Sequence, residues 1–149
     1  GHQENGRRGG TQSVAMAEGL VLALEATLKE TVSPALRDDL ERRLLAALPG
    51  TRINGAGAPR VSTTSNLCFP GADGEGLLIA LDLEGICVST GAACASGSLT
   101  PSHVLTSMGL SPSEAQATLR LSLGRATTAA EIDAVVRALT KLVPSVRAS

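Results

Sequence analysis

Apolar residues recur at helical spacing along the first third of the chain. Between residues 13 and 31 they fall on roughly one helical face, and neighbouring leucines widen the stripe. The width of this stripe predicts a helix that is covered on most of its sides. A second helix is predicted from Ser33-Pro34, a pair typical of a helix start, to Pro49-Gly50, a pair that ends helices.

The pattern changes at residue 52, where β-branched and polar residues replace the leucine-rich stripes. We predict a short strand and a turn within 51–60, a strand within 61–70 and a helix within 73–85. A brief strand within 86–90 then leads directly into a segment of small residues.

Alternation of apolar and polar residues is clearest in residues 118–124, TLRLSLG. It predicts a half-buried strand with Arg120 and Ser122 on the same face. Two short helices are predicted before this strand, and the second begins with a capping box from Ser111 to Glu114.

A final amphipathic helix is predicted behind a second capping box, which runs from Thr128 to Glu131. The element order is therefore α-α-β-β-α-β-loop-α-α-β-α. This order predicts an α+β fold in which a few mostly antiparallel strands carry helices on one face.

Composition narrows the classes of function. The chain has 149 residues, 43% hydrophobic and 18% charged, which suits one domain with its own core and excludes a disordered protein. The net charge of -1 excludes a protein that binds nucleic acid by electrostatic attraction. The absence of Trp and Tyr removes the aromatic side chains on which the bases of single-stranded nucleic acid stack. No apolar run is long enough to cross a membrane, so we expect a cytoplasmic protein without membrane partners.

The cysteines do not form a recognisable framework. Cys68, Cys87 and Cys94 are too few and too unevenly spaced for a set of disulfides, and no spacing typical of a zinc site occurs. No metal is therefore expected, and core packing is predicted for Cys68 and Cys87.

Three groups could carry chemistry. Cys94 stands in STGAACASGS, residues 89–98, where it is either an inert small residue or a displayed nucleophile. Arg120 could hold a carboxylate through two parallel hydrogen bonds or be an ordinary surface arginine. GRRGGT, residues 6–11, could cradle a phosphate or be a flexible basic linker.

Together these segments resemble the NifS/IscS-type cysteine desulfurases, class-V aminotransferases that depend on pyridoxal phosphate (PLP). GHQENGRRGGT is similar to the family's Gly-Gly-x-Gln-Glu-x-Gly-x-Arg-x-Gly-Thr motif. STGAACASGS followed by PSHVLTSMGL resembles its cysteine loop and the helix behind it, and LRLSLGRATTAAEID resembles its closing strand and helix. NLCFPGADGEGLLIALD resembles the strand and helix before the loop, so the matches cover nearly all of the chain in the family's order.

The resemblance implies a reaction and roles for four residues. The intact enzyme would take sulfur from L-cysteine, release L-alanine and leave a persulfide on Cys94 for an acceptor such as an iron–sulfur scaffold or a sulfur carrier. Arg120 would hold the substrate carboxylate, and Thr11 would reach the PLP phosphate of the neighbouring subunit in a homodimer. Arg8 is the motif arginine, with a supporting role. Nothing in the sequence separates L-cysteine from selenocysteine as the substrate.

The resemblance breaks at the lysine that would bind PLP. The chain has only Lys29 and Lys141, and neither stands in the family's Ser-x-His-Lys type of motif. We therefore expect the chain to be the C-terminal portion of a desulfurase and to be inactive by itself.

This interpretation divides the chain into three parts. Residues 1–12 would form the cofactor-phosphate and dimer loop at the end of the large domain, and residues 13–32 the long connecting helix. Residues 33–149 would be the small C-terminal domain of a fold-type I PLP enzyme, with the cysteine loop at 89–100. Two alternatives remain, a PLP-free sulfur carrier that accepts a persulfide on Cys94 and an interaction module that docks a scaffold protein.

Overall fold

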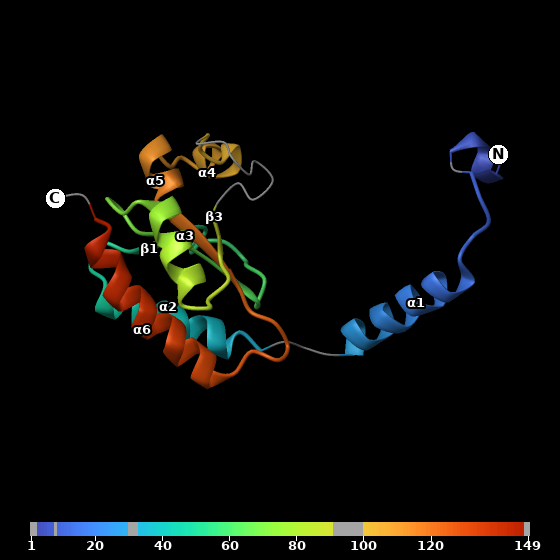
Figure 1. The fold of residues 1–149 in the computed structure, drawn as a ribbon, viewed down its shortest axis with the longest axis horizontal. Helices are drawn as coiled ribbons and strands as arrows, with labels where there is room; N and C mark the ends of the chain where they lie inside the picture. The colour runs from blue at the N-terminus through green and yellow to red at the C-terminus, as the bar shows by residue number, and fades with distance from the viewer. Residues whose placement is uncertain (1–2, 8, 30–32, 91–99, 148–149) are drawn as a thin grey trace. The chain divides into compact units, whose positions relative to one another are not determined.

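The computed structural model of the protein describes residues 3–7, 9–29, 33–90 and 100–147. The chain divides into two compact units, Gly1–Thr31 and Val32–Ser149, which we call the N-terminal and the C-terminal unit. Figure 1 shows the helices and strands of both. The division of the chain into three functional parts stays a prediction.

The N-terminal unit contains a short 3-10 helix, η1 (Gln3–Gly6), and one long helix, α1 (Val14–Lys29). The helix begins and ends close to the predicted residues, but none of its residues is buried. Its large apolar side chains, Leu20 among them at 71% exposure, face solvent. The expectation of a covered helix is therefore not met within this unit, because a unit with one long helix has no second apolar surface of its own to pack against.

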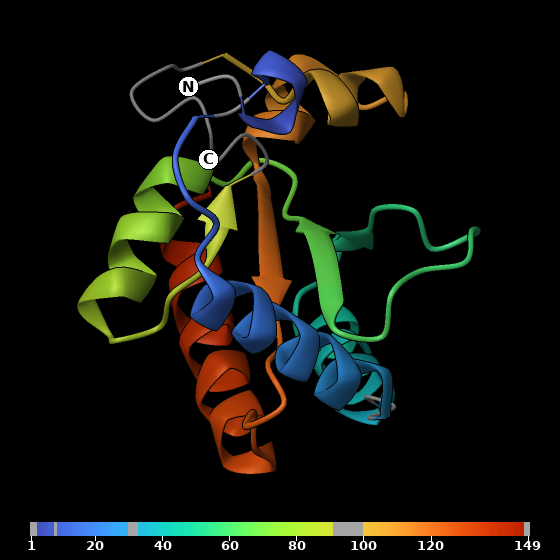
Figure 2. The ribbon, with the colours of Figure 1, turned by 90° about the vertical axis from the view of Figure 1, so that its right-hand side faces the viewer.

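The C-terminal unit is built on a four-stranded antiparallel sheet with the strand order β1-β2-β4-β3. Its strands are β1 (Arg52–Ile53), β2 (Thr64–Cys68), β3 (Ser89–Thr90) and β4 (Thr118–Ser122). Figure 2 shows β2 and β4 side by side in the middle of the unit. The predicted α+β class and antiparallel sheet are confirmed.

Three helices cover one face of this sheet, as predicted. They are α2 (Ala35–Ala47), α3 (Gly74–Leu83) and α6 (Ala129–Ser145). Their leucines form a single core with the inward side chains of the two central strands. The fully buried members of this core include Leu40, Leu44, Leu67, Phe69, Leu77, Leu81, Leu119, Leu139 and Val143.

The other two helices, α4 (His103–Ser107) and α5 (Pro112–Gln116), are short. The predicted capping boxes are present at the starts of α5 and α6, where each N-cap hydroxyl accepts from the N3 backbone and the N3 glutamate accepts from the N-cap backbone. Sequence alone therefore placed both helix starts correctly.

Helix α5 closes the end of the sheet on the face away from the core. The Cys68 thiol and the Thr118 hydroxyl both donate to the carbonyl oxygen of Glu114, at 3.4 Å and 2.8 Å. The Glu114 carboxylate forms an ion pair with Arg52 of β1. Arg52, followed by the backbone and side chain of Ser111, lowers the pKa of Glu114 to about 2. The Glu114 carboxylate thus takes part both in the capping box of α5 and in an ion pair with a distant strand.

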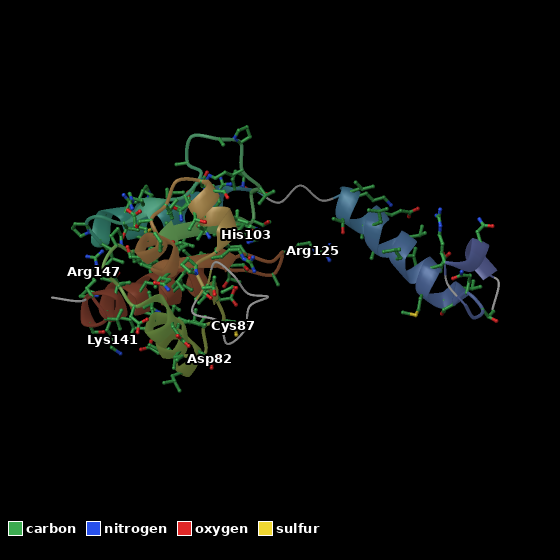
Figure 3. The ribbon with its side chains drawn as sticks, turned by 90° about the horizontal axis from the view of Figure 1, so that it is seen from above. Asp82, Cys87, His103, Arg125, Lys141 and Arg147 are labelled. Atoms are coloured by element: carbon green, nitrogen blue, oxygen red, sulfur yellow. The ribbon has the colours of Figure 1, made fainter. Side chains whose placement is uncertain are left out.

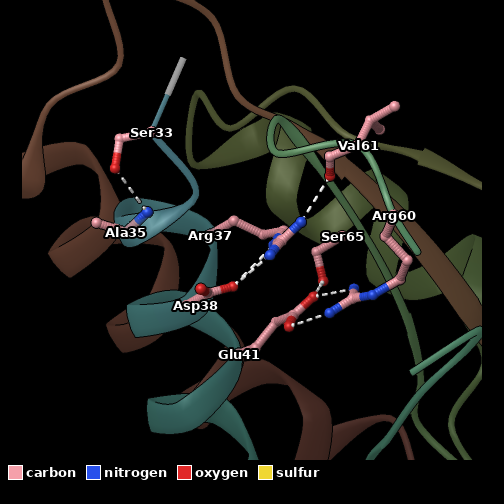
Figure 4. A network of polar contacts seen from close by, with 8 residues as sticks. All are labelled: Ser33, Ala35, Arg37, Asp38, Glu41, Arg60, Val61 and Ser65. Atoms are coloured by element: carbon pink, nitrogen blue, oxygen red, sulfur yellow. Dashed lines mark hydrogen bonds and ion pairs between the residues drawn. The ribbon is translucent and has the colours of Figure 1, made fainter. Parts of the chain in front are cut away.

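A buried ion pair joins α2 to β2 and to the segment before it (Figure 4). Glu41 is only 4% exposed, and both of its carboxylate oxygens accept from Arg60, at 2.6 Å and 2.9 Å. Ser65 donates to the same carboxylate at 2.7 Å. Beside them, the Arg37 guanidinium donates to the Val61 carbonyl oxygen at 2.6 Å. These contacts fix the long segment between β1 and β2 against the helix layer.

Candidate functional site

Arg120 stands on the face of the sheet that α2, α3 and α6 leave open. Its neighbours in β4, Leu119 and Leu121, are 0% and 5% exposed because they enter the core. Side chains alternate between the faces of a strand, so Arg120 and Ser122 share the outer face, and both are exposed. The predicted orientation of Arg120 is confirmed.

The strand register places Arg120 in a transverse row of four polar residues. Its Cα partners are Asn66 in β2 and Ser89 in β3. Asn54, which follows β1, is next in register opposite Asn66, and its backbone N–H donates to the Asn66 carbonyl oxygen at 2.9 Å. The order across the sheet is therefore Asn54, Asn66, Arg120, Ser89. Directly opposed residues share a face, so this row forms one polar surface.

Hydrogen bonds organise one half of this row. The Asn54 side-chain amino group donates to Asn66 Oδ1 at 2.6 Å and to the Thr118 hydroxyl at 3.5 Å. On the other side of Arg120, the Ser89 hydroxyl donates to the Thr90 carbonyl oxygen at 3.1 Å. The row is thus a pre-formed polar strip and not a set of independent surface side chains.

Arg120 itself keeps its guanidinium available. Its side chain has no hydrogen bond or ion pair with another residue in the part of the chain that the structure describes. A guanidinium offers paired N–H donors whose spacing matches the two oxygens of a carboxylate. The site can therefore bind a carboxylate or a similar planar anion.

Two of the candidate residues lie outside the described residues. Cys94 belongs to the segment 91–99, and Arg8 is likewise not described. Covalent geometry still limits Cys94, because the five residues after Ser89 can span at most about 17 Å. Ser89, from which this limit is counted, is the Cα partner of Arg120.

Thr11 is described, and it is exposed in the segment between η1 and α1. It belongs to the N-terminal unit, whereas Arg120 belongs to the C-terminal unit. The phosphate-binding role of Thr11 stays a prediction.

The two other cysteines differ from each other. Cys68 is fully buried, as a packed cysteine should be, although it lies beneath α5 and not in the cluster under the three covering helices. Cys87 is exposed, so the prediction of core packing is wrong for it (Figure 3). It precedes β3 and lines a groove of about 350 Å³ beside Ile86 and Ile132. The apolar residues Ile86 and Val88 on either side pack against the core and leave Cys87 facing outward.

The described residues of the C-terminal unit do not form a site for covalently bound PLP. Such a site needs a lysine that bonds to the cofactor, and the chain has only two lysines. Lys29 lies in the N-terminal unit, and Lys141 is bound to Glu84 at 3.0 Å on the helix side of the sheet (Figure 3). Arg120 faces the opposite side, so Lys141, the lysine of the C-terminal unit, does not complete its site.

Within the described ranges, no group of three or more His, Cys, Asp or Glu side chains is arranged to hold a metal ion. None of the described helices is both long enough and apolar enough to span a membrane. The expected cytoplasmic location stays a prediction.

Sequence reasoning found Arg120 but missed its neighbours. Asn66 and Ser89 begin the segments NLCFPGADGEGLLIALD and STGAACASGS, but neither segment indicates that they lie beside Arg120. Together with Asn54 they meet only because three antiparallel pairings bring distant segments into one register. Alternation within residues 61–70 could have placed Asn66 on the outer face, opposite to Leu67. It could not have shown which residue of another strand Asn66 faces.

Comparison with known proteins shows the family of the chain. The family model for class-V aminotransferases matches residues 2–135. Cysteine desulfurase 2 of Trichormus variabilis is 45% identical over 99% of this chain, and the cysteine desulfurase NifS of Azotobacter vinelandii is 42% identical over the same share. The chain spans 38% of the length of each of these relatives.

Solved structures agree with this relationship. The X-ray structure of a NifS-like protein from Rickettsia africae has a TM-score of 0.78 and 31% identity, covering 98% of this chain and 39% of that one. A second structure, described as a NifS-like protein, has a TM-score of 0.77 and 29% identity, covering 97% and 38%. The fold of the present chain is thus similar to a part of such proteins.

Proposed function

Because the chain belongs to the class-V aminotransferase family, we propose that it is the C-terminal part of a cysteine desulfurase. The intact protein would remove sulfur from L-cysteine, release L-alanine and leave a persulfide on Cys94. The observation that carries this proposal is the position of Arg120, an unpaired guanidinium on the open face of the sheet. Its neighbouring strand, β3, leads directly into the segment with the cysteine.

Each residue has a separate task in this proposal. Arg120 binds the carboxylate of L-cysteine and so fixes where the substrate sulfur lies. The Cys94 thiolate attacks that sulfur, an S–S bond forms, and the carbon–sulfur bond of the substrate breaks. The electron pair of the broken bond stays with the carbon fragment, which gains a proton and leaves as L-alanine. The outer sulfur of the persulfide is then available to an acceptor.

PLP and the lysine that binds it would come from outside this chain. Thr11, with Arg8 in support, would reach the phosphate of the cofactor in the neighbouring subunit of a homodimer. The acceptor would be an iron–sulfur scaffold or another sulfur-carrier protein. By itself the chain would be inactive, because neither of its two lysines stands in the Ser-x-His-Lys type of motif that binds PLP in the family.

The first experiment is a visible absorption spectrum of the purified protein before and after L-cysteine is added. For the 149-residue chain we expect no band from a PLP–lysine linkage and no change with L-cysteine. For the chain joined to, or mixed with, the lysine-bearing part of the protein, we expect such a band and a change on addition of substrate.

The second experiment tests Cys94 in that complete protein. Cys94→Ser should abolish sulfur release and leave the PLP band intact, because serine cannot accept a sulfur atom. The matched control is Cys87→Ser, which removes an exposed thiol that has no part in the proposal. Full sulfur release by Cys94→Ser would show that Cys94 is not the acceptor. Persulfide transfer to Cys94 without any PLP band would instead favour the sulfur-carrier alternative.

A further inference from the structure

The row of polar residues assigns a second member to the carboxylate site. We propose that Asn66 supplies a hydrogen-bond donor beside Arg120 and so orients the substrate carboxylate. This inference rests on the proposed function, because it assumes that the anion held by Arg120 is the carboxylate of an amino acid. It adds a specificity-determining residue in a segment, NLCFPGADGEGLLIALD, to which the sequence analysis gave no role in binding.

The first argument is position. Asn66 is the Cα partner of Arg120 across the two central strands, and both side chains lie on the open face. The Cβ atoms of directly opposed residues are about 4.5–5.5 Å apart. A carboxylate held by the Arg120 guanidinium therefore lies within reach of the Asn66 side chain.

The second argument is the direction of the hydrogen bonds that lead to Asn66, that is, which group donates and which accepts. A backbone carbonyl can only accept, so the Thr118 hydroxyl must donate to the carbonyl oxygen of Glu114 at 2.8 Å. The lone pairs of the Thr118 hydroxyl then face the Asn54 side chain at 3.5 Å, which must present its amino group there. The same amino group donates to Asn66 Oδ1 at 2.6 Å, so the oxygen of Asn66 is occupied.

This chain of bonds determines what Asn66 can offer a ligand. Its oxygen is turned towards Asn54, on the β1 side of β2, and its amino group is turned away from Asn54. Among the described residues that amino group has no hydrogen-bond acceptor. A half-buried donor without a partner next to an unpaired guanidinium is a site that favours an anion.

The third argument separates Asn66 from the other neighbour of Arg120. Ser89 also faces Arg120, but its hydroxyl donates to the Thr90 carbonyl oxygen at 3.1 Å. Its single proton is therefore already used. Of the two side chains that flank Arg120, Asn66 is the one with donors to spare.

The test in the complete protein compares Asn66→Asp with Thr64→Asp. Asn66→Asp keeps the oxygen that Asn54 binds and replaces the amino group by a carboxylate oxygen beside Arg120. We expect KM for L-cysteine to rise at least about tenfold, as for a lost hydrogen bond to a charged group, with little change in kcat. Thr64→Asp adds the same charge to the same face opposite Ser122, and KM should stay within about twofold.

The neutral variant Asn66→Ser removes the amino group without adding a charge, so it separates loss of the donor from the effect of the new charge. Thermal unfolding checks that each variant is folded. KM should rise in Asn66→Ser as well, by a smaller factor. An unchanged KM in Asn66→Asp, or an equal rise in Thr64→Asp, overturns the role of Asn66. Because the wild-type protein would still release L-alanine and sulfur in that case, the proposed function would stand.

A measurement without turnover uses the 149-residue chain labelled with ¹⁵N. Three Asn and three Gln give few side-chain amide signals. L-alanine should shift the signals of the Asn66 amino group and of Arg120 Nε–H, whereas ethylamine, which lacks only the carboxylate, should not. A shift of Arg120 without Asn66 overturns this inference alone. No shift of either residue overturns the carboxylate site at Arg120 as well.

Discussion

Glu41 is a charged residue whose surroundings decide its contribution to stability. Burial by itself would raise the pKa of its carboxyl, but the hydrogen bonds from Arg60 and Ser65 outweigh burial, and the pKa lies below its ordinary value of 4.5. A carboxylate with a lowered pKa stabilises the fold where it is ionised. Its contribution is present above the ordinary pKa and is lost as the pH falls through the lowered pKa.

For this single residue we predict the effect of Glu41→Gln on the free energy of unfolding. The variant leaves the Arg60 guanidinium without its charge partner and should be destabilised by about 2–3 kcal/mol at pH 7. The difference from wild type should shrink as the pH falls below about 4.5, because wild type then loses the ion pair too. Urea unfolding between pH 3 and pH 7 measures this, with the exposed Asp82→Asn as the control. A difference that does not vary with pH would contradict the prediction.

Close contact of two elements explains a glycine at the first residue of α3. A Cβ atom at Gly74 would lie 2.0 Å from the carbonyl oxygen of Gln116, at the end of α5. Backbone atoms cannot move aside as the end of a flexible side chain can. The N-terminus of α3 and the C-terminus of α5 therefore depend on each other for their positions.

The prediction at the scale of elements is that Gly74→Ala destabilises the C-terminal unit. Overpacking of this kind costs about 1–3 kcal/mol, and contact with backbone places it at the upper end of that range. Gly57→Ala is the matched control, since its Cβ would meet nothing within 4 Å. Equal urea midpoints for Gly74→Ala and Gly57→Ala would show that α3 and α5 can separate without cost.

The whole molecule consists of two units with different means of stabilisation. Among the described residues, every member of the hydrophobic core belongs to the C-terminal unit. The N-terminal unit exposes the apolar side chains of α1 and buries none of its residues within the described range. Global stability of this chain should therefore reside in residues 32–149.

We accordingly predict that a chain of residues 32–149 folds by itself. Its urea-unfolding transition should be cooperative, with a free energy of unfolding within about 0.5 kcal/mol of that of the full chain. Circular dichroism should show a loss of helical signal that corresponds to α1 alone. A non-cooperative transition, or a much lower midpoint, would show that the N-terminal unit stabilises the sheet.

Local patterns in the sequence determined much of this protein. Helix spacing, two capping boxes and the alternation of residues 118–124 predicted the order of the elements and the outward face of Arg120. These features depend on residues within one turn or one strand, so they can be recognised without tertiary contacts. The motifs around Cys94 likewise indicated the family, because they are continuous in the chain.

Only the tertiary structure decided which residues meet. The strand order and register place Asn54, Asn66 and Ser89 in a row with Arg120, although they come from four separate segments. Cys87 faces solvent because Ile86 and Val88 on either side of it pack against the core, and the apolar run of these three residues does not by itself reveal which of them points outward. Pairing partners and burial depend on the packing of distant elements, and a pattern along one segment contains no information about its partner.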